Sequence, residues 1–181
     1  MKQAKVSLEY AYGAAQSTPM LSQLIAERRA DELVLNNGIV LEVRSSSFRR
    51  IRGVTCVAAI MDETAFWKSE DSANVDTDIP AALRPALATT HGLLIAVSSP
   101  HARRGILWES FRRNYGADGD PEILVAKGAS RTFNPSLPQK IITRTLERDP
   151  AGARAEYLAD FRDDLSGLLT QEAMALVPTS E

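Results

Sequence analysis

The sequence predicts an α/β fold in which a parallel sheet is flanked by helices. Two uninterrupted apolar runs, at residues 57–61 and 93–97, indicate strands buried on both faces, as the strands of a parallel sheet usually are. Between and after them, residues 79–88 and 105–115 space their apolar side chains as helices do. Strands that alternate with helices are typical of βαβ units, whose strands lie parallel in one sheet.

The residues before the first of these strands indicate a helix and a hairpin. Residues 19–29 begin with Thr18-Pro19, a plausible helix start, and have helical spacing of their apolar residues. Two β-rich runs, 33–35 and 39–43, flank Asn36-Asn37-Gly38. Asn-Gly tolerates positive φ at both positions, so this turn predicts a β-hairpin.

After the second apolar run the pattern changes twice. A short apolar run at residues 123–126 predicts a third buried strand. From Asn134 onward the chain is charged and helical in pattern. The predicted helices lie at residues 139–146 and 150–161, with a weaker helical pattern at 165–181.

Composition excludes several classes of protein. The 181 residues are 44% apolar and 24% charged, as in ordinary globular proteins, and a net charge of −2 excludes a globally basic nucleic-acid binder. The single cysteine, Cys56, excludes a disulfide framework and a cysteine-rich zinc site. The sequence shows no signal peptide and no apolar stretch near the ~20 residues that span a bilayer. We therefore expect a cytoplasmic protein without a membrane partner.

Asp62 and Glu63 follow the first apolar run directly, at the carboxyl end of the predicted strand. Open α/β sheets bind ligands at that edge, and two adjacent carboxylates are costly to desolvate there unless a cation compensates. In a nucleotide-hydrolysing site, the aspartate would hold Mg²⁺ and the glutamate would orient or deprotonate the attacking water. Alternatively, Asp62 caps a helix that starts at Thr64, with Glu63 in its first turn. The acid pair alone favours neither interpretation.

Ser98 and Ser99 end the second apolar run and are expected at the same edge of the sheet. Their hydroxyl groups can hydrogen-bond a γ-phosphate or its attacking water, and can pass that contact on to neighbouring elements. With Pro100 behind them, the same residues also fit an ordinary turn between a strand and a loop.

Arg49, Arg50 and Arg52 lie in a serine-rich loop before the first apolar run, and Gly53 gives that loop backbone freedom. An arginine there can reach a phosphate in its own site or in that of a neighbouring subunit. Contact with a DNA backbone is a second interpretation, and a plain solvated loop is a third.

Six segments, taken in order and spacing, carry a family resemblance over roughly residues 20 to 170. They are Asn37-Gly38, the serine-rich loop with Arg52-Gly53, IMDETAFW at 60–67, LLIAVSSP at 93–100, NPSLP at 134–138 and AEYLADF at 155–161. Together they resemble the large terminase subunit of tailed bacteriophages. That family is the ATP-driven motor that packages viral DNA into a procapsid.

The resemblance implies a P-loop NTPase-type fold that uses ATP and Mg²⁺. It implies that Asp62 and Glu63 are the Walker B pair, with Asp62 on Mg²⁺ and Glu63 as the catalytic carboxylate. Ser98, Ser99 and Pro100 would be the coupling motif that links nucleotide hydrolysis to movement. Arg52 stands where the family carries an arginine suspected of acting across the motor ring. The implied partners are double-stranded DNA, other large subunits in a ring, the small terminase subunit and the portal.

The family's ATPase core begins with a P-loop, G-x-x-x-x-G-K-[ST], but no glycine is followed by lysine in these 181 residues. We therefore expect residues 1–133 to be a partial ATPase domain that starts after this loop, incomplete at its N-terminus. Residues 134–181 would be a helical linker towards an absent nuclease domain, and Asp160, Asp163 and Asp164 would be linker charges. The isolated chain is expected to be inactive.

Two alternatives remain open. A fragment of a DNA helicase core would share the strand-end Asp-Glu pair, although residues 134–161 do not supply helicase motifs. A non-catalytic packaging or scaffold protein would keep the sheet as a surface for binding a partner.

Overall fold

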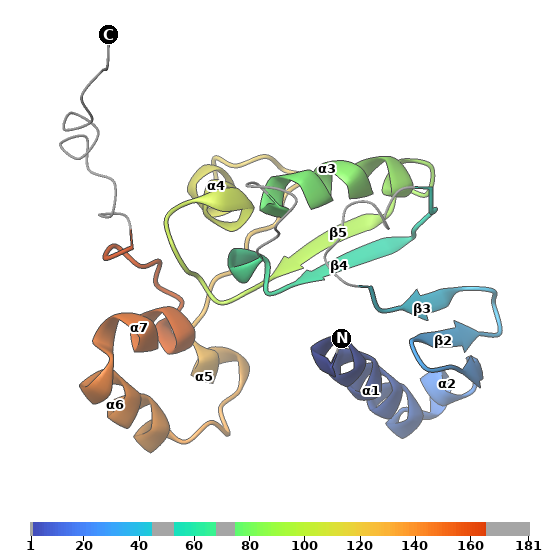
Figure 1. The fold of residues 1–181 in the computed structure, drawn as a ribbon, viewed down its shortest axis with the longest axis horizontal. Coiled ribbons are helices and arrows are strands. Elements are labelled where there is room, and N and C mark those ends of the chain that lie inside the picture. The colour runs from blue at the N-terminus through green and yellow to red at the C-terminus, as the bar shows by residue number, and fades with distance from the viewer. Residues whose placement is uncertain (1, 45–52, 68–74, 166–181) are drawn as a thin grey trace, which may run out of the picture. The chain divides into compact units, whose positions relative to one another are not determined.

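The computed structural model describes residues 2–44, 53–67 and 75–165 (Figure 1). The chain divides into two compact units, Met1–Arg50 and Ile51–Glu181. Each unit has its own sheet, with three antiparallel strands in the first and two parallel strands in the second. The structure is therefore mixed α/β, and over the described residues its parallel part is a two-stranded sheet.

The first unit consists of two helices followed by the antiparallel sheet. In chain order these are α1 (Lys2–Ser17), α2 (Pro19–Ser22), β1 (Ile25–Arg28), β2 (Glu32–Leu35) and β3 (Val40–Glu42). The strands lie in the order β1-β2-β3. α1 contacts β2, and Leu8 of α1 and Leu33 of β2 are buried.

The hairpin predicted around Asn37-Gly38 is confirmed. β2 and β3 pair antiparallel, and the Leu35 amide donates to the Ile39 carbonyl over 2.8 Å. Gly38 has a φ of 84°, a left-handed conformation that glycine adopts without a steric penalty. The residues of the turn itself are therefore enough to predict this hairpin.

The helix predicted over residues 19–29 is wrong beyond Ser22. α2 ends there, and Ile25–Arg28 forms β1, which pairs antiparallel with β2. Pairing with β2 satisfies the backbone amides and carbonyls on the side of this stretch that faces β2. Tertiary context of this kind overrides a weak local helical pattern.

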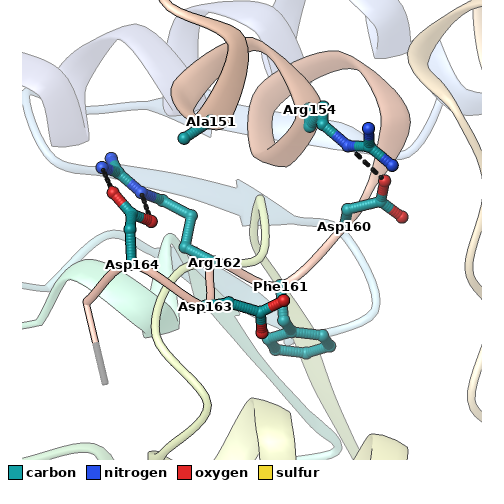
Figure 2. A pocket seen from close by; sticks show the side chains of 7 residues that line it. All are labelled: Ala151, Arg154, Asp160, Phe161, Arg162, Asp163 and Asp164. Carbon is teal, nitrogen blue, oxygen red and sulfur yellow. Dashed lines mark hydrogen bonds and ion pairs between the residues drawn. The ribbon is translucent and has the colours of Figure 1, made fainter. Parts of the chain in front are cut away.

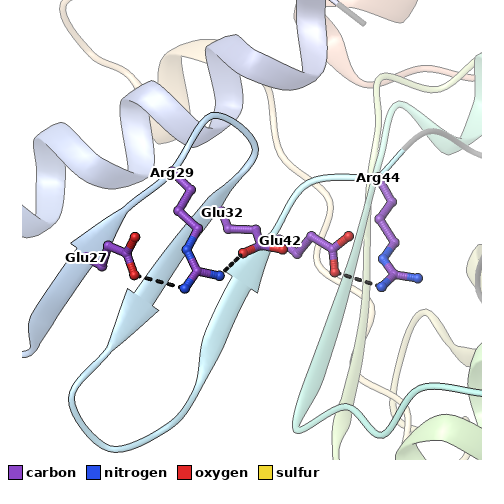
Figure 3. A network of polar contacts seen from close by, with 5 residues as sticks. All are labelled: Glu27, Arg29, Glu32, Glu42 and Arg44. Carbon is purple, nitrogen blue, oxygen red and sulfur yellow. Dashed lines mark hydrogen bonds and ion pairs between the residues drawn. The ribbon is translucent and has the colours of Figure 1, made fainter.

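Ion pairs join the ends of the strands in this unit. Arg29, which follows β1, donates to Glu27 and Glu32, both over 2.9 Å, and Arg44 pairs with Glu42 at 2.7 Å (Figure 3). A hydrogen bond from Arg29 and its positive charge hold the pKa of Glu27 below its ordinary value. Because solvent screens exposed pairs, they contribute little to stability.

The second unit is organised around two parallel strands. In chain order its elements are β4 (Ala58–Asp62), the short 3₁₀ helix η2 (Thr64–Phe66), α3 (Val75–Ala88), β5 (Leu93–Val97), α4 (Gly105–Asn114), α5 (Ser130–Phe133), α6 (Gln139–Arg148) and α7 (Pro150–Leu158). β4 and β5 pair in register, from Ala58 opposite Leu93 to Asp62 opposite Val97. α3 contacts both strands, and Met61 and Ile79 are buried in the core of this unit. The predictions of β4, β5, α3 and α4 are confirmed as to type.

Gly92 lets β5 begin close to the residues that precede β4. A Cβ atom at this position would lie 2.8 Å from the Val57 carbonyl oxygen and 2.9 Å from that of Cys56. The next amide, that of Leu93, donates to the Val57 carbonyl over 3.2 Å. The glycine thus permits the close approach with which the parallel pairing starts.

The expectation that both strands are buried on both faces is wrong. Figure 1 shows α3 lying along one face of the pair. On the strands, Ile60 is 68% exposed, Leu93 66% and Val97 53%, whereas Met61 is 3% exposed. The described part of the chain buries one face only. Parallel sheets are usually covered on both faces, so this sheet lacks a layer within the described residues.

The third strand predicted at residues 123–126 is also wrong. The stretch has no regular secondary structure, and Leu124 is 93% exposed. A strand is stable only when a neighbouring strand accepts its backbone hydrogen bonds, and over the described residues none lies beside this run. Its apolar sequence is therefore not enough to form a strand.

The two helices predicted in the C-terminal part are confirmed, and α7 ends at Leu158, earlier than expected. α6 and α7 contact each other. The Asp149 side chain accepts the Gly152 amide over 2.9 Å and so caps α7. The division at residue 133 stays a prediction, and all but the first residue of the predicted segment 165–181 lies outside the described residues. None of the described helices is long and apolar enough to cross a membrane.

We expect the two faces of β4 to respond differently to truncation. Met61→Ala should lower the free energy of unfolding by about 2–4 kcal/mol, because it leaves a cavity under α3. Ile60→Ala on the exposed face should change it by less than about 0.5 kcal/mol. Urea unfolding followed by circular dichroism measures both. Equal losses would contradict the one-sided burial of this sheet.

Candidate functional site

The candidate site lies where β4 and β5 end side by side. Since Asp62 is opposite Val97, the residues that follow both strands meet at the same edge of the sheet. The Ser98 hydroxyl accepts the Ala65 amide at 3.2 Å, and its single proton can go to the Ser99 carbonyl at 3.0 Å or to the Glu63 carboxylate at 3.5 Å. The structure therefore brings together the acid pair and the serine pair that the sequence singles out.

The backbone of Glu63 is in a left-handed conformation, with φ 55° and ψ 39°. This conformation costs an L-residue other than glycine roughly 1–2 kcal/mol, and it persists only where the surroundings enforce it. Here the Phe66 amide donates to the Glu63 carbonyl over 3.0 Å, and Ser98 contacts the Glu63 side chain. Among the described residues His91 and Ala159 share this conformation, and Glu63 is the one of the three that also lies beside the acid and serine pairs.

The capping interpretation of Asp62 does not hold. The helix that follows is only the three residues of η2, its N-cap position is Glu63, and no side chain caps it. The Asp62 carbonyl accepts the indole N–H of Trp67 over 2.8 Å, while the residue itself is exposed. Its carboxylate is thus available at the sheet edge.

The environment of Glu63 changes its affinity for protons. Partial burial, then repulsion from Asp62 and Glu156, raises the pKa of the Glu63 carboxyl above its ordinary value. Hydrogen bonds from the Ser98 hydroxyl and the Ser99 backbone act in the opposite direction but are smaller. A carboxylate with raised proton affinity is better suited to accept a proton from water.

Thr64, next to Glu63, is 1% exposed, and its hydroxyl group has no hydrogen-bond partner within the described structure. A buried hydroxyl without a partner costs free energy. The sequence pattern gave no indication of this residue. It also missed Glu156 on α7, because nothing in a charged helix indicates that one carboxylate lies near a distant strand end.

An exposed carboxylate at this edge could take part in holding a Mg²⁺ ion that a nucleotide brings with it. Mg²⁺ in phosphate-transfer sites is held by one or two carboxylates together with substrate phosphates and water. Asp62 provides such an exposed carboxylate, and the Ser98 hydroxyl lies beside its neighbour Glu63. Within the described ranges, no three acidic, histidine or cysteine side chains form a metal-binding cluster.

Arg52, with Arg49 and Arg50, lies outside the described residues, so its predicted role stays a prediction. The C-terminal acids do not join this edge and form ion pairs around a pocket at α7: Asp160 with Arg154, Asp164 with Arg162 (Figure 2), and Asp163 with Arg103.

No model of a known protein family matches the chain, and no curated protein matches it. The assignment of a function to this site therefore depends on the geometry and chemistry of the site itself.

We expect Glu63→Gly to stabilise the chain, by up to about 1 kcal/mol, because glycine removes the strain of the left-handed backbone. The substitution also removes the unfavourable charge next to Asp62. His91→Gly is the matched control, since His91 has a similar φ of 50° but lies outside the site. Free energies of unfolding from urea titrations measure both variants. A loss of stability in Glu63→Gly would show that the side-chain contacts of Glu63 outweigh its backbone strain.

Proposed function

We propose that the chain is the Walker B part of an ATPase domain in a phage terminase large subunit, with a P-loop NTPase-type fold. One observation carries the proposal: β4 and β5 end side by side, with the Ser98 hydroxyl 3.5 Å from the Glu63 carboxylate. An acid pair beside a hydroxyl group at the carboxyl edge of a parallel sheet suits a nucleotide-hydrolysing site. The motif segments found in the sequence favour the same family.

In this proposal Asp62 holds the Mg²⁺ that accompanies ATP, and Mg²⁺ neutralises the charge of the phosphates. Glu63 orients the attacking water and accepts its proton, a role that its raised pKa favours. The Ser98 hydroxyl contacts both the Glu63 carboxylate and the Ala65 amide, so it would pass a change at the nucleotide on to η2. Ser99 continues this contact into the segment that follows β5.

The phosphate-binding loop would come from outside these 181 residues, which contain no G-x-x-x-x-G-K-[ST] segment. The exposed apolar face of β4 and β5 supports this, because a parallel sheet is stable when further strands and helices cover it. Arg52 would reach the phosphates of a neighbouring subunit's ATP. Residues 134–181 would lead towards a nuclease domain.

The proposed setting is the cytoplasm of a bacterial host. There the chain would act in a ring of large subunits that moves double-stranded DNA into a procapsid through the portal, together with the small terminase subunit.

A second candidate function is a non-catalytic packaging or scaffold role. The observation that favours it is the exposed apolar face itself, since Ile60, Leu93 and Val97 offer a surface for a partner. In that case the acid pair would have no chemical role.

Complementation tests the proposal. We expect no ATP hydrolysis by the isolated chain, and hydrolysis once it is mixed with an upstream terminase polypeptide that contains the P-loop. Glu63→Gln should lower the restored rate by roughly 10²–10⁴-fold, the usual contribution of a general base. Phosphate release measured against time gives the rate.

Glu147→Gln on α6 is the control, because Glu147 is an exposed glutamate outside the site. It should leave the rate unchanged. A mixture that binds but stays inactive would favour the scaffold role. Turnover by the isolated chain that Glu63→Gln abolishes would contradict the need for an external loop.

A further inference from the structure

A short segment after α7 lies against the chain that follows β5. We name residues 160–163 the clasp. At its centre, the Arg162 amide donates to the His101 carbonyl over 2.8 Å, and Arg162 forms a parallel β-bridge with Ala102. Ala102 is 8% exposed, so the bridge is a packed contact and not a surface approach. The two residues that the clasp contacts, His101 and Ala102, begin only two positions after Ser99.

Side chains hold the clasp on α4 and on the segment before it. The Phe161 ring meets Trp108 edge to face, with centroids 4.8 Å apart, and lies 5.3 Å from Phe111. Asp163 pairs with Arg103 at 2.6 Å. Aromatic pairs of this kind contribute beyond the area they bury, whereas exposed ion pairs contribute little. Phe161 is therefore the main anchor of the clasp.

From the clasp, contacts continue to the candidate site. The ring of His101, whose carbonyl the clasp holds, lies 4.8 Å from the ring of Phe66 in η2. The Phe66 amide in turn donates to the Glu63 carbonyl. A second route runs along the chain from Ala102 back to Ser98, whose hydroxyl accepts the Ala65 amide. Both routes end on the residues that surround Glu63.

We propose that the clasp is a positioning element: Phe161 and the Arg162 backbone fix residues 98–102 and thereby hold the Ser98 hydroxyl beside Glu63. A displacement of α7, from which only Ala159 separates the clasp, then loosens the site edge without any change in β4 or β5. That this would alter ATP hydrolysis rests on the proposed function. The mechanical link between the clasp and Ser98 does not, because it depends only on contacts within this unit.

The Ala65 amide is a direct reporter of the Ser98 hydroxyl, since it donates to that oxygen. The Arg162 amide reports the clasp in the same way through its bond to His101. In the full 181-residue chain, Phe161→Ala should speed hydrogen exchange at both amides by roughly tenfold. The nuclear magnetic resonance signal of the Ala65 amide should also move towards its position in Ser98→Ala.

Tyr115→Ala is the matched control. Tyr115 stacks on Phe111 at 4.9 Å, so this variant removes a ring from the same cluster without touching the clasp. It should leave the Ala65 amide unchanged. The Leu35 amide of the β2–β3 hairpin, in the other unit, is the internal reference and should not change in any variant.

If Phe161→Ala does not fold, Phe161→Leu keeps most of the side-chain volume and should give a smaller rise at the same two amides. Faster exchange at Arg162 with no change at Ala65 would overturn the proposal, because the clasp would then open without moving Ser98. Because this experiment contains no nucleotide, its failure is distinct from a failure of the complementation test.

Discussion

The in-register parallel pairing of β4 with β5 is the constraint on which the site depends. The acid pair and the serine pair are more than thirty residues apart in the sequence. Only this register brings the carboxyl ends of both strands next to each other. Gly92 permits the close approach at the start of the pairing, and Met61 anchors β4 in the core that α3 covers. A slip of one residue would turn the core side chains outwards and would separate Ser98 from Glu63.

Whether an element depends on local or on distant residues explains which features the sequence could predict. The β2–β3 hairpin and the capped helix α7 follow from local chemistry, the Asn-Gly turn in one case and Asp149-Pro150 in the other. The predictions of a helix where β1 forms and of a strand at residues 123–126 were wrong. A strand depends on its partner, which a local pattern does not show. Likewise, an apolar run indicates a strand but cannot show whether a second layer covers it, as the exposure of Ile60 demonstrates.

For the site, the sequence predicts that the acids and serines share an edge, because the carboxyl ends of parallel strands meet there. It does not predict the left-handed backbone of Glu63, the buried hydroxyl of Thr64 or the nearness of Glu156. All three arise from packing between distant segments. Together they place a strained backbone, a buried unpaired hydroxyl and neighbouring negative charges at or next to Glu63. Binding sites are expected to show such unfavourable features before a ligand binds.

The most direct test of the account is a carbon-13 nuclear magnetic resonance titration of the Glu63 carboxyl in the native chain and in Ser98→Ala. Burial, Asp62 and Glu156 raise its pKa, and the Ser98 hydrogen bond lowers it. The account predicts a pKa above the ordinary glutamate value in the native chain and a still higher pKa in Ser98→Ala. An ordinary pKa that Ser98→Ala leaves unchanged would contradict it, because Glu63 and Ser98 would then not form one site.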